Sequence, residues 1–408
     1  MRREYVLSEH QLDDFGLLVQ SWMERINSFG RNEDGGYTRP LGSKALSDCQ
    51  RSLEEALQSV GFQTWIDGAD NVHAVLPFGK RGAREILVGS HIDTVIEGGM
   101  FDGALGVAAG IAAALFLQKN EIQLQKNIHI VATNGEEGNE LGGTFGSRAM
   151  AGVLPLDDPE FLKKAKKYGY DREKLEASRY DFSKTAAYLE LHIEQGPTLW
   201  KSNEDIGVVT GLVGLRRYAV FVHGLQNHAG TTMMEDRKDA LVEAAHLVLL
   251  ADQLARETGH HFVATVGKLD VTPNLPPVVP GMVDMVLEMR SESEERMDEF
   301  YQAFLERGKR LADFSAEPIV KKAPSLCNRD LIETIERVCK EENLNYRKMP
   351  SGATHDGTAI STKVPFGMIF VPSIRGISHA KEEQTDWEQV EKGSRVLLRT
   401  AADLAKEA

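Results

Sequence analysis

Cysteine is scarce in this sequence. Only three of the 408 residues are cysteines, Cys49, Cys327 and Cys339, and no two of them stand at CxxC spacing. A disulfide framework needs several paired cysteines, and a thiolate zinc site needs closely spaced ones, so neither is predicted. The low count suits a protein of the reducing cytoplasm.

Positive charge and long apolar runs are also in short supply. The 47 Lys and Arg residues face 61 Asp and Glu residues, a net charge of −14, which disfavours the phosphate contacts that dominate binding to nucleic acids. No stretch approaches the roughly 18 uninterrupted apolar residues of a membrane span. The first residues, MRREYVLSEHQLDDF, carry charges where a signal peptide has its apolar core. We therefore expect a soluble, cytoplasmic protein that binds neither nucleic acid nor membranes.

The rest of the composition predicts a folded chain of more than one domain. Hydrophobic residues make up 42% and charged residues 26%, far from the composition of disordered chains. A chain of 408 residues suits two or three domains of about 150 residues each.

Short apolar, β-rich runs alternate with helical stretches over much of the chain. We expect strands at Glu85–Gly89, Asn127–Thr133, Ala187–His192 and Pro365–Val371, and an Ala-rich helix over Gly103–Leu117. Such alternation is typical of an α/β fold with a mixed, mostly parallel sheet.

The order of the predicted helices and strands changes between residues 213 and 326. There the pattern predicts the order βαββαβ, with long helices over Asp239–Thr258 and Ser293–Leu311. This order describes a small α+β, ferredoxin-like domain. Because strands resume after it, we predict a discontinuous large domain, residues 1–212 and 327–408, with residues 213–326 inserted into it as a lid and dimerisation domain.

Three histidines stand near the ends of predicted strands. His91 and His192 end two of them, and His379 lies eight residues beyond the last. Functional side chains of open α/β sheets gather outside the carboxyl ends of the strands, so the three histidines are expected to converge. Asp93 follows His91 at the second position, where its carboxylate is suited to accept the other imidazole N–H and orient the ring.

Three acidic residues accompany these histidines. Asp102 stands among glycines in GGMFDG, where it is suited to bridge two metals, and Glu136 and Glu137 follow the Asn127–Thr133 strand. Neighbouring loop residues point in different directions, so one glutamate can bind metal while the other acts as a general base. Each piece alone is a weak signal. Their order along the chain, each after a predicted strand, is the stronger one.

This order and the local sequences resemble the M20 family of di-metal aminoacylases and peptidases. The nearer resemblance is to its branch of N-carbamoyl-L-amino acid hydrolases, allantoate amidohydrolases and β-ureidopropionases. It covers residues 35–395 and is carried by the motifs SHIDTV, GGMFDGALGV, EEG, GSRAMAG, ELHIEQGP, VTGLVGL, HAGTT, DRKDA, PSGATHD and GMIFVPSIRGISH.

The resemblance implies two divalent metal ions per chain, either zinc, manganese, cobalt or nickel. It assigns one ion to His91, Asp102 and His192, and the other to Asp102, Glu137 and His379. Glu136 then becomes the general base.

The resemblance also implies residues that act on the substrate. His228 in NHAG matches the histidine that stabilises the oxyanion, often of the partner subunit, and Arg290 matches the arginine that clamps the substrate carboxylate. Gln195 and His355 match polar positions lining the substrate pocket. A homodimer formed through the small domain is expected on the same ground.

The chain departs from the branch in two places that bear on the substrate. Pro277 stands where an Asn is usual, so the substrate-holding amide is absent or displaced to Asn274. Gly135 replaces an acidic or polar residue just before the acid pair. An alignment that placed Gly135 at the base position would leave a crippled enzyme, but NIHIVATNGEEG matches without a gap.

The expected activity is hydrolysis of the ureido or amide C–N bond of an N-carbamoyl-L-amino acid or allantoate-like substrate with a free carboxylate. It would release amino acid, ammonia and CO2. Two alternatives stay open: an M20 aminoacylase or dipeptidase, and a metal-poor homologue that acts as a binding protein.

Overall fold

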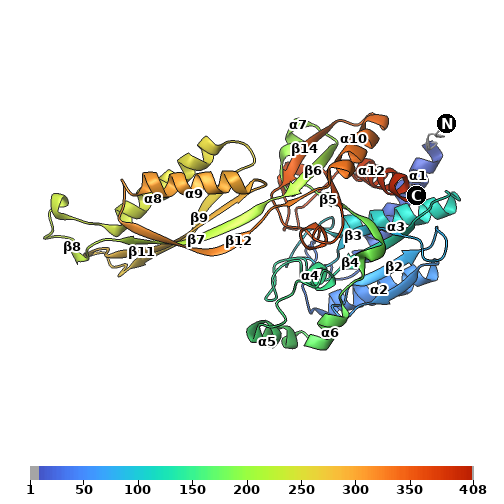
Figure 1. The fold of residues 1–408 in the computed structure, drawn as a ribbon, viewed down its shortest axis with the longest axis horizontal. Helices are drawn as coiled ribbons and strands as arrows, with labels where there is room; N and C mark the ends of the chain where they lie inside the picture. Colours follow the sequence, from blue (N-terminus) through green and yellow to red (C-terminus); the bar gives the residue numbers. More distant parts are fainter. Residues whose placement is uncertain (1–8, 407–408) are drawn as a thin grey trace. The chain divides into compact units, whose positions relative to one another are not determined.

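The computed structural model describes residues 9–406 and divides the chain into two compact units. The first comprises Met1–Thr210 with Leu326–Ala408, and the second Gly211–Ser325. A mixed sheet with helices on its faces forms the first unit, and a separate antiparallel sheet with two helices forms the second (Figure 1). The predicted fold class is thereby confirmed.

The large unit is built on a nine-stranded sheet. Its parallel centre has the order β4-β3-β5-β15, and the neighbours β2 and β6 pair with this centre in the antiparallel direction. The strands are β1 (Gln63–Ile66), β2 (Val72–Leu76), β3 (Glu85–His91), β4 (Asn127–Thr133), β5 (Thr185–Ile193), β6 (Ile206–Leu212), β13 (Ser325–Leu326), β14 (Tyr346–Ser351) and β15 (Phe366–Val371).

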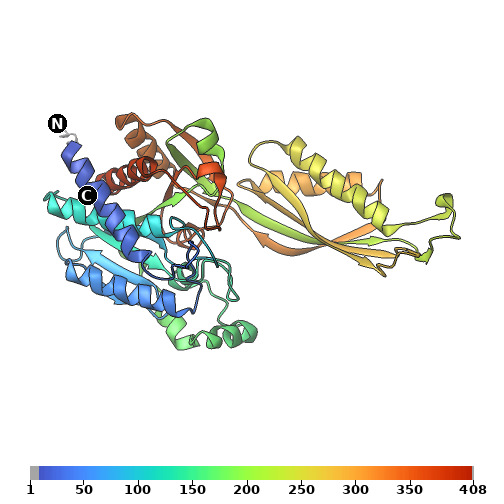
Figure 2. The same ribbon diagram turned by 180° about the vertical axis from the view of Figure 1, so that it is seen from behind.

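The main core lies between this sheet and a layer of helices. The layer consists of α1 (Glu9–Ile26), α2 (Lys44–Ser59), α3 (Ala104–Lys119), α10 (Arg329–Glu341) and α12 (Trp387–Lys406). Helix α3 is rich in Ala and Gly and is buried on nearly all sides, because it packs against α1, α12 and the sheet at once (Figure 2). Small residues permit this close approach, and α3 begins directly after Asp102 and Gly103.

Shorter helices cover other parts of the large unit. They are α4 (Phe145–Met150), α5 (Pro159–Lys167), α6 (Arg172–Ala177), α7 (Thr198–Ser202) and α11 (Gly357–Ile360). Phe145, Phe161, Tyr170 and Leu175 join α4, α5 and α6 in a second, smaller core.

The small unit follows the predicted βαββαβ order. Its sheet has the order β12-β7-β11-β9, and α8 and α9 cover one face of it (Figure 1). The elements are β7 (Gly214–His223), α8 (Ala240–Thr258), β9 (Val263–Thr272), β11 (Met282–Ser291), α9 (Glu294–Gly308) and β12 (Phe314–Lys322). Along β11, Val283, Met285, Leu287 and Met289 are buried and alternate with less buried residues, as one-sided packing requires.

No helix within residues 9–406 has the length and apolar character needed to cross a membrane.

Candidate active site

Four neighbouring parallel strands of the large unit carry polar groups at or beyond their carboxyl ends. His91 is the last residue of β3, and His192 is the last but one of β5. Glu136 and Glu137 follow β4, and His379 follows β15. Since the carboxyl ends of parallel strands meet at one edge of a sheet, the fold brings together residues that are far apart in the chain.

The first cluster consists of His91, Asp102 and His192, all of them buried. Asp102 Oδ1 lies 3.2 Å from His91 Nε2 and 3.2 Å from His192 Nε2. One ligand atom from each residue lies within 4.8 Å of the others, so a single ion can contact all three.

The second cluster consists of Asp102, Glu137 and His379. His379 Nε2 lies 3.5 Å from Asp102 Oδ2 and 3.4 Å from Glu137 Oε2. Asp102 thus offers one oxygen to each cluster, which is the arrangement of a carboxylate that bridges two cations. The side chain of His379 is 52% exposed, so the second cluster opens to solvent.

The backbone conformation and the close surroundings of residue 103 explain why a glycine follows the shared aspartate. The φ of Gly103 is +66°, in the region that favours glycine, and a Cβ there would lie 2.5 Å from the ring of His91. A larger residue would displace either His91 or the start of α3.

Backbone carbonyls orient both buried histidines. His91 Nδ1 lies 3.0 Å from the carbonyl oxygen of Asp93, and His192 Nδ1 lies 2.9 Å from that of Ile193. Each Nδ1–H donates to its carbonyl, so Nε2, which faces Asp102, is the nitrogen that can bind a metal. In this structure His192 Nε2 also accepts the backbone N–H of Gly103 at 3.2 Å.

The carboxylate of Asp93 has a different task from the expected one. It lies 3.7 Å from His91 Nδ1, beyond hydrogen-bond distance, and accepts the backbone N–H groups of Glu136 and Glu137, both at 3.1 Å. The backbone carbonyl of Asp93 orients His91 in its place. Asp93 therefore connects the loop that follows β3 to the loop that carries Glu136 and Glu137.

Glu136 belongs to neither cluster but lies beside the first. Its Oε2 is 3.7 Å from His91 Nε2, and its side chain is buried. Burial raises the pKa of Glu136 well above its usual range, and the nearby carboxylates of Asp356 and Glu137 raise it further. A carboxyl group whose pKa is raised in this way is suited to take up a proton and return it.

The donor set fits divalent cations. Burial of several carboxylates side by side is costly unless positive charge compensates them, and Asp93, Asp102, Glu136 and Glu137 are all buried here. Imidazole nitrogens and carboxylate oxygens suit zinc, manganese, cobalt and nickel. Protons compensate the charge when no cation does: burial alone would lower the pKa of His91, but Glu136 and Asp102 hold it well above its usual value.

The metal-free protein is therefore expected to lose stability as the pH rises from 6 to 9. Burial and Asp102 raise the pKa of Glu137 from 4.5 to about 8, so the folded state holds a proton that the unfolded state has released. The stabilisation from this proton is complete below about pH 4.5 and is lost as the pH passes 8. The raised pKa of His91 acts with the same sign.

Thermal unfolding of chelator-treated protein at several pH values measures this loss. We expect the Tm to fall by about 5 °C or more between pH 6 and pH 9, and added Zn²⁺ or Mn²⁺ to restore most of it. Glu137→Gln should make this fall in Tm smaller, because His91 and Glu136 still hold protons in the folded state, whereas Glu140→Gln, a matched change at an exposed position, should leave it unchanged. A Tm independent of pH in the metal-free wild type would contradict the expectation.

Gln195 and His355 both lie at the clusters. Gln195 Nε2 donates to Asp102 Oδ2 at 2.8 Å and lies 3.4 Å from His379 Nε2. The ring of His355 is buried against that of His192, with centroids 4.5 Å apart, and its Nε2 lies 3.1 Å from Ser351 Oγ. Burial lowers the pKa of His355 well below its usual value, so its ring is neutral.

Sequence reasoning missed Asp356, the residue after His355 in SGATHD. It is fully buried, accepts a hydrogen bond from the Thr133 hydroxyl, and contributes to the raised pKa of Glu136. In the sequence, Asp356 could have been recognised from its place as the acidic last residue of SGATHD.

The small unit holds His228 on a short strand, β8 (Asn227–His228), which pairs with β10 (Val278–Val279). Its side chain is exposed. The backbone N–H of Gly230 donates to His228 Nδ1 at 3.0 Å, so Nδ1 is the acceptor and Nε2 carries the hydrogen of the ring. The HAG motif thus presents an N–H donor to solvent, as an oxyanion-stabilising histidine needs.

Two residues secure the His228 loop. Arg237, from the DRKDA motif, donates to the carbonyl groups of Thr232 and Ala229. The carbonyl of Pro277 accepts the N–H of Ala229 at 2.9 Å. Pro277, where the branch has Asn, therefore supports this loop through its backbone.

The remaining predicted substrate residues also lie in the small unit. Arg290 belongs to β11, on the face opposite the helices, and its Nε donates to Glu288 at 2.8 Å. Asn274 adopts a φ of +57° in the segment between β9 and β10.

Gly135, in the large unit, has a φ of +67°, which explains why a glycine replaces the acidic or polar residue usual before the acid pair.

Comparison with known proteins gives a family match. The profile of peptidase family M20/M25/M40 matches residues 87–403, a span that includes every residue of both clusters.

Individual relatives match over nearly the whole chain. The N-carbamoyl-L-amino acid amidohydrolase of Geobacillus stearothermophilus is 34% identical, with 95% of this chain and 98% of the relative covered. The allantoate amidohydrolase of Escherichia coli (strain K12) is 31% identical, with 96% and 98% covered. Among solved structures, an amidase of the hydantoinase/carbamoylase family from Burkholderia multivorans superposes with a TM-score of 0.86 at 27% identity, covering 96% of this chain and 98% of that one.

Proposed function

Since the chain belongs to peptidase family M20/M25/M40, we propose that it is a metal-dependent amidohydrolase that cleaves the ureido C–N bond of an N-carbamoyl-L-amino acid or an allantoate-like compound. The observation that carries the proposal is the pair of clusters sharing Asp102, with Glu136 beside them and in neither. The names of the relatives from Geobacillus and Escherichia coli support this substrate class.

Two divalent cations per chain would occupy the clusters. His91, Asp102 and His192 would hold one cation, and Asp102, Glu137 and His379 the other. When bound, such cations lower the pKa of water and polarise the substrate carbonyl.

Glu136 moves the proton in the proposed reaction. Its carboxylate takes a proton from the attacking water as the C–O bond forms, and then returns it to the nitrogen that leaves as the C–N bond breaks. The products are the free amino acid and a carbamate, which decomposes to ammonia and CO2. Glu136 is buried beside His91, which would limit the exchange of this proton with solvent.

The small unit would complete the site. We propose that His228 Nε2–H donates to the developing oxyanion and that Arg290 binds the substrate carboxylate with its planar guanidinium. Arg290 already binds one carboxylate, that of Glu288, so a substrate carboxylate would share or replace this partner. Gln195, His355 and Asn274 would line the pocket, and the segments near residues 212 and 326 would act as hinges.

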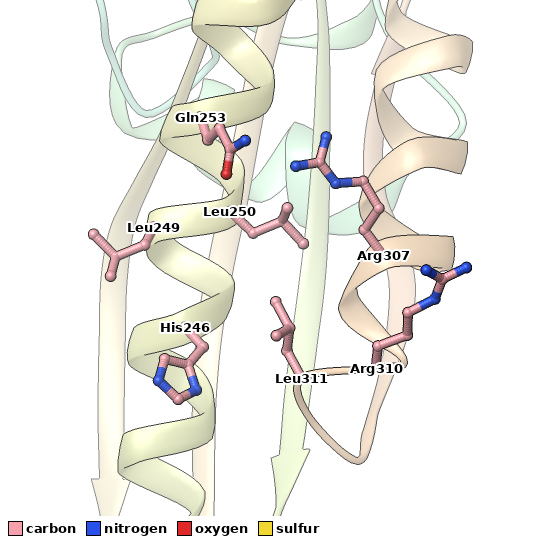
Figure 3. A pocket seen from close by; sticks show the side chains of 7 residues that line it. All are labelled: His246, Leu249, Leu250, Gln253, Arg307, Arg310 and Leu311. Atoms are coloured by element: carbon pink, nitrogen blue, oxygen red, sulfur yellow. The ribbon is translucent and has the colours of Figure 1, made fainter.

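A homodimer through the small unit is part of the proposal. Helix α8 exposes Val242 and Leu249, which are 52% and 67% accessible, and Figure 3 shows Leu249 pointing away from α9. Strand β9 is an edge strand of its sheet and exposes Val263. An exposed edge strand beside apolar helix residues is suited to pair with a second copy of itself. Light scattering should give the mass of two chains, and a monomeric mass at micromolar concentration would contradict this.

The cytoplasm is the proposed compartment, because all three cysteines are buried free thiols.

Product analysis tests the proposed activity. Enzyme reloaded with Mn²⁺, Co²⁺, Ni²⁺ or Zn²⁺ would be given N-carbamoyl-L-amino acids, allantoate, N-acetylamino acids and dipeptides, with Glu136→Gln as the control. We expect ammonia together with free amino acid from the carbamoyl substrates, or ammonia from allantoate, with wild type only. Amino acid from acetyl or peptide substrates without ammonia would assign the chain to the aminoacylases or dipeptidases. Inactivity with every metal, combined with failure to bind metal, would favour a binding protein.

A further inference from the structure

Glu383 is a buried carboxylate in the loop that follows His379. Its side chain is only 3% exposed, and it lies four residues after His379 in GISHAKEE. Buried carboxylates need partners, so the groups that Glu383 binds indicate its purpose.

The first partners belong to the loop that carries Asp102. Glu383 Oε1 accepts the backbone N–H groups of Phe101 and Asp102, at 3.0 and 3.1 Å. A Cβ on Gly99 would lie 2.1 Å from this oxygen, so a glycine at the start of GGMFDG is what lets Glu383 approach. Glu383 thereby fixes the backbone on which the shared ligand stands.

The second connection reaches the side chain of the same aspartate. Ser378 Oγ lies 2.8 Å from Glu383 Oε2 and 2.9 Å from Asp102 Oδ2. Ser378 is also the residue before His379. Glu383 and Ser378 thus connect the Asp102 loop with the loop that carries His379.

We propose that Glu383 is a positioning residue of the metal centre, which holds Asp102 and the His379 loop at the spacing that two cations require. This proposal rests on the proposed two-metal function and adds a determinant that lies outside both clusters. The carboxylate of Glu383 itself is committed to two backbone N–H groups and one hydroxyl, so it acts through Asp102 and Ser378.

Metal affinity, measured without reference to activity, tests the proposal. Metal-free wild type, Glu383→Ala and Glu383→Gln would be titrated with Zn²⁺ and with Mn²⁺ against a chelating indicator. We expect Glu383→Ala to bind metal about 10- to 100-fold more weakly than wild type, as loss of a partner of a metal ligand typically does. Glu383→Gln should stay within about threefold of wild type, because an amide oxygen still accepts both N–H groups and an amide N–H can donate to Ser378.

Glu382→Ala is the matched control, since it removes the same charge from the neighbouring exposed residue. It should bind metal as wild type does. Unchanged affinity in Glu383→Ala, or equal weakening in the alanine and glutamine variants, would overturn the proposal.

A third variant covers the case in which Glu383→Ala fails to fold. Ser378→Ala removes only the hydroxyl connection and should weaken metal binding by about tenfold, the lower end of the usual range; unchanged affinity would overturn the proposal. Wild-type affinity and stoichiometry report on the metal centre, and wild-type products report on the reaction. Failure of the proposed function is therefore seen in wild type, and failure of this inference in the ratio between variants.

Discussion

Glu136→Gln is expected to lower kcat about 1000-fold while metal binding stays within a few-fold of wild type. The amide has the shape of the carboxylate but cannot take a proton from water. Glu136 lies outside both clusters, 3.7 Å from His91 Nε2, so its loss removes the proposed base and leaves both proposed sets of ligands intact. Turnover of the best carbamoyl substrate, together with metal content by mass spectrometry, measures the two quantities on the same sample.

A neighbouring variant makes this test sharper. Glu137→Gln changes the adjacent residue, which belongs to the second cluster, and should weaken metal binding as well as turnover. Glu136 would lose its assigned role if Glu136→Gln kept more than a tenth of wild-type kcat, or if the two variants lost metal equally.

Asp102→Ala is expected to have the second of the two largest effects, the loss of both cations. Asp102 directs Oδ1 to His91 and His192, and Oδ2 to His379, which shares the second cluster with Glu137. One substitution therefore removes a ligand from each cluster. We expect affinity for both ions to fall by at least about 100-fold and turnover to become undetectable without excess metal.

His379→Ala is the comparison for Asp102→Ala. His379 belongs only to the second cluster, so this variant should keep one ion per chain, and metal stoichiometry at fixed free Zn²⁺ separates the two cases. Circular dichroism at pH 6, where protons compensate the buried acids, checks that both variants are folded. If Asp102→Ala retained one tightly bound ion, Asp102 would not be a shared ligand.

The sequence alone determined the elements and the chemistry-bearing residues to a large degree. Strands β3, β4, β5 and β15 lie at or within a few residues of their predicted positions, because short β-rich apolar runs between glycines and polar loops have few other ways to be buried. The end of α8 is as predicted and its start follows the capping Asp239. The acidic residues and histidines of the site could be recognised in the sequence because each follows such a strand.

The tertiary structure decided which polar groups bind one another and which acidic side chains are buried. Asp93 illustrates this. The HxD motif was evident in the sequence, but whether the carbonyl or the carboxylate of Asp93 binds His91 depends on the position of the loop that carries Glu136. Asp356 and Glu383 show the same limit, since a buried acid and an exposed one look alike in a sequence.

Glu383 marks this boundary most clearly. Nothing in its local sequence distinguishes it from Glu382 beside it, and 281 residues separate it from Asp102. Local propensity and periodicity act over a few residues along the chain, so they predict elements. The partner of a buried polar group is chosen when distant strands pair in the sheet and their loops meet at one edge, and only the folded chain contains that choice.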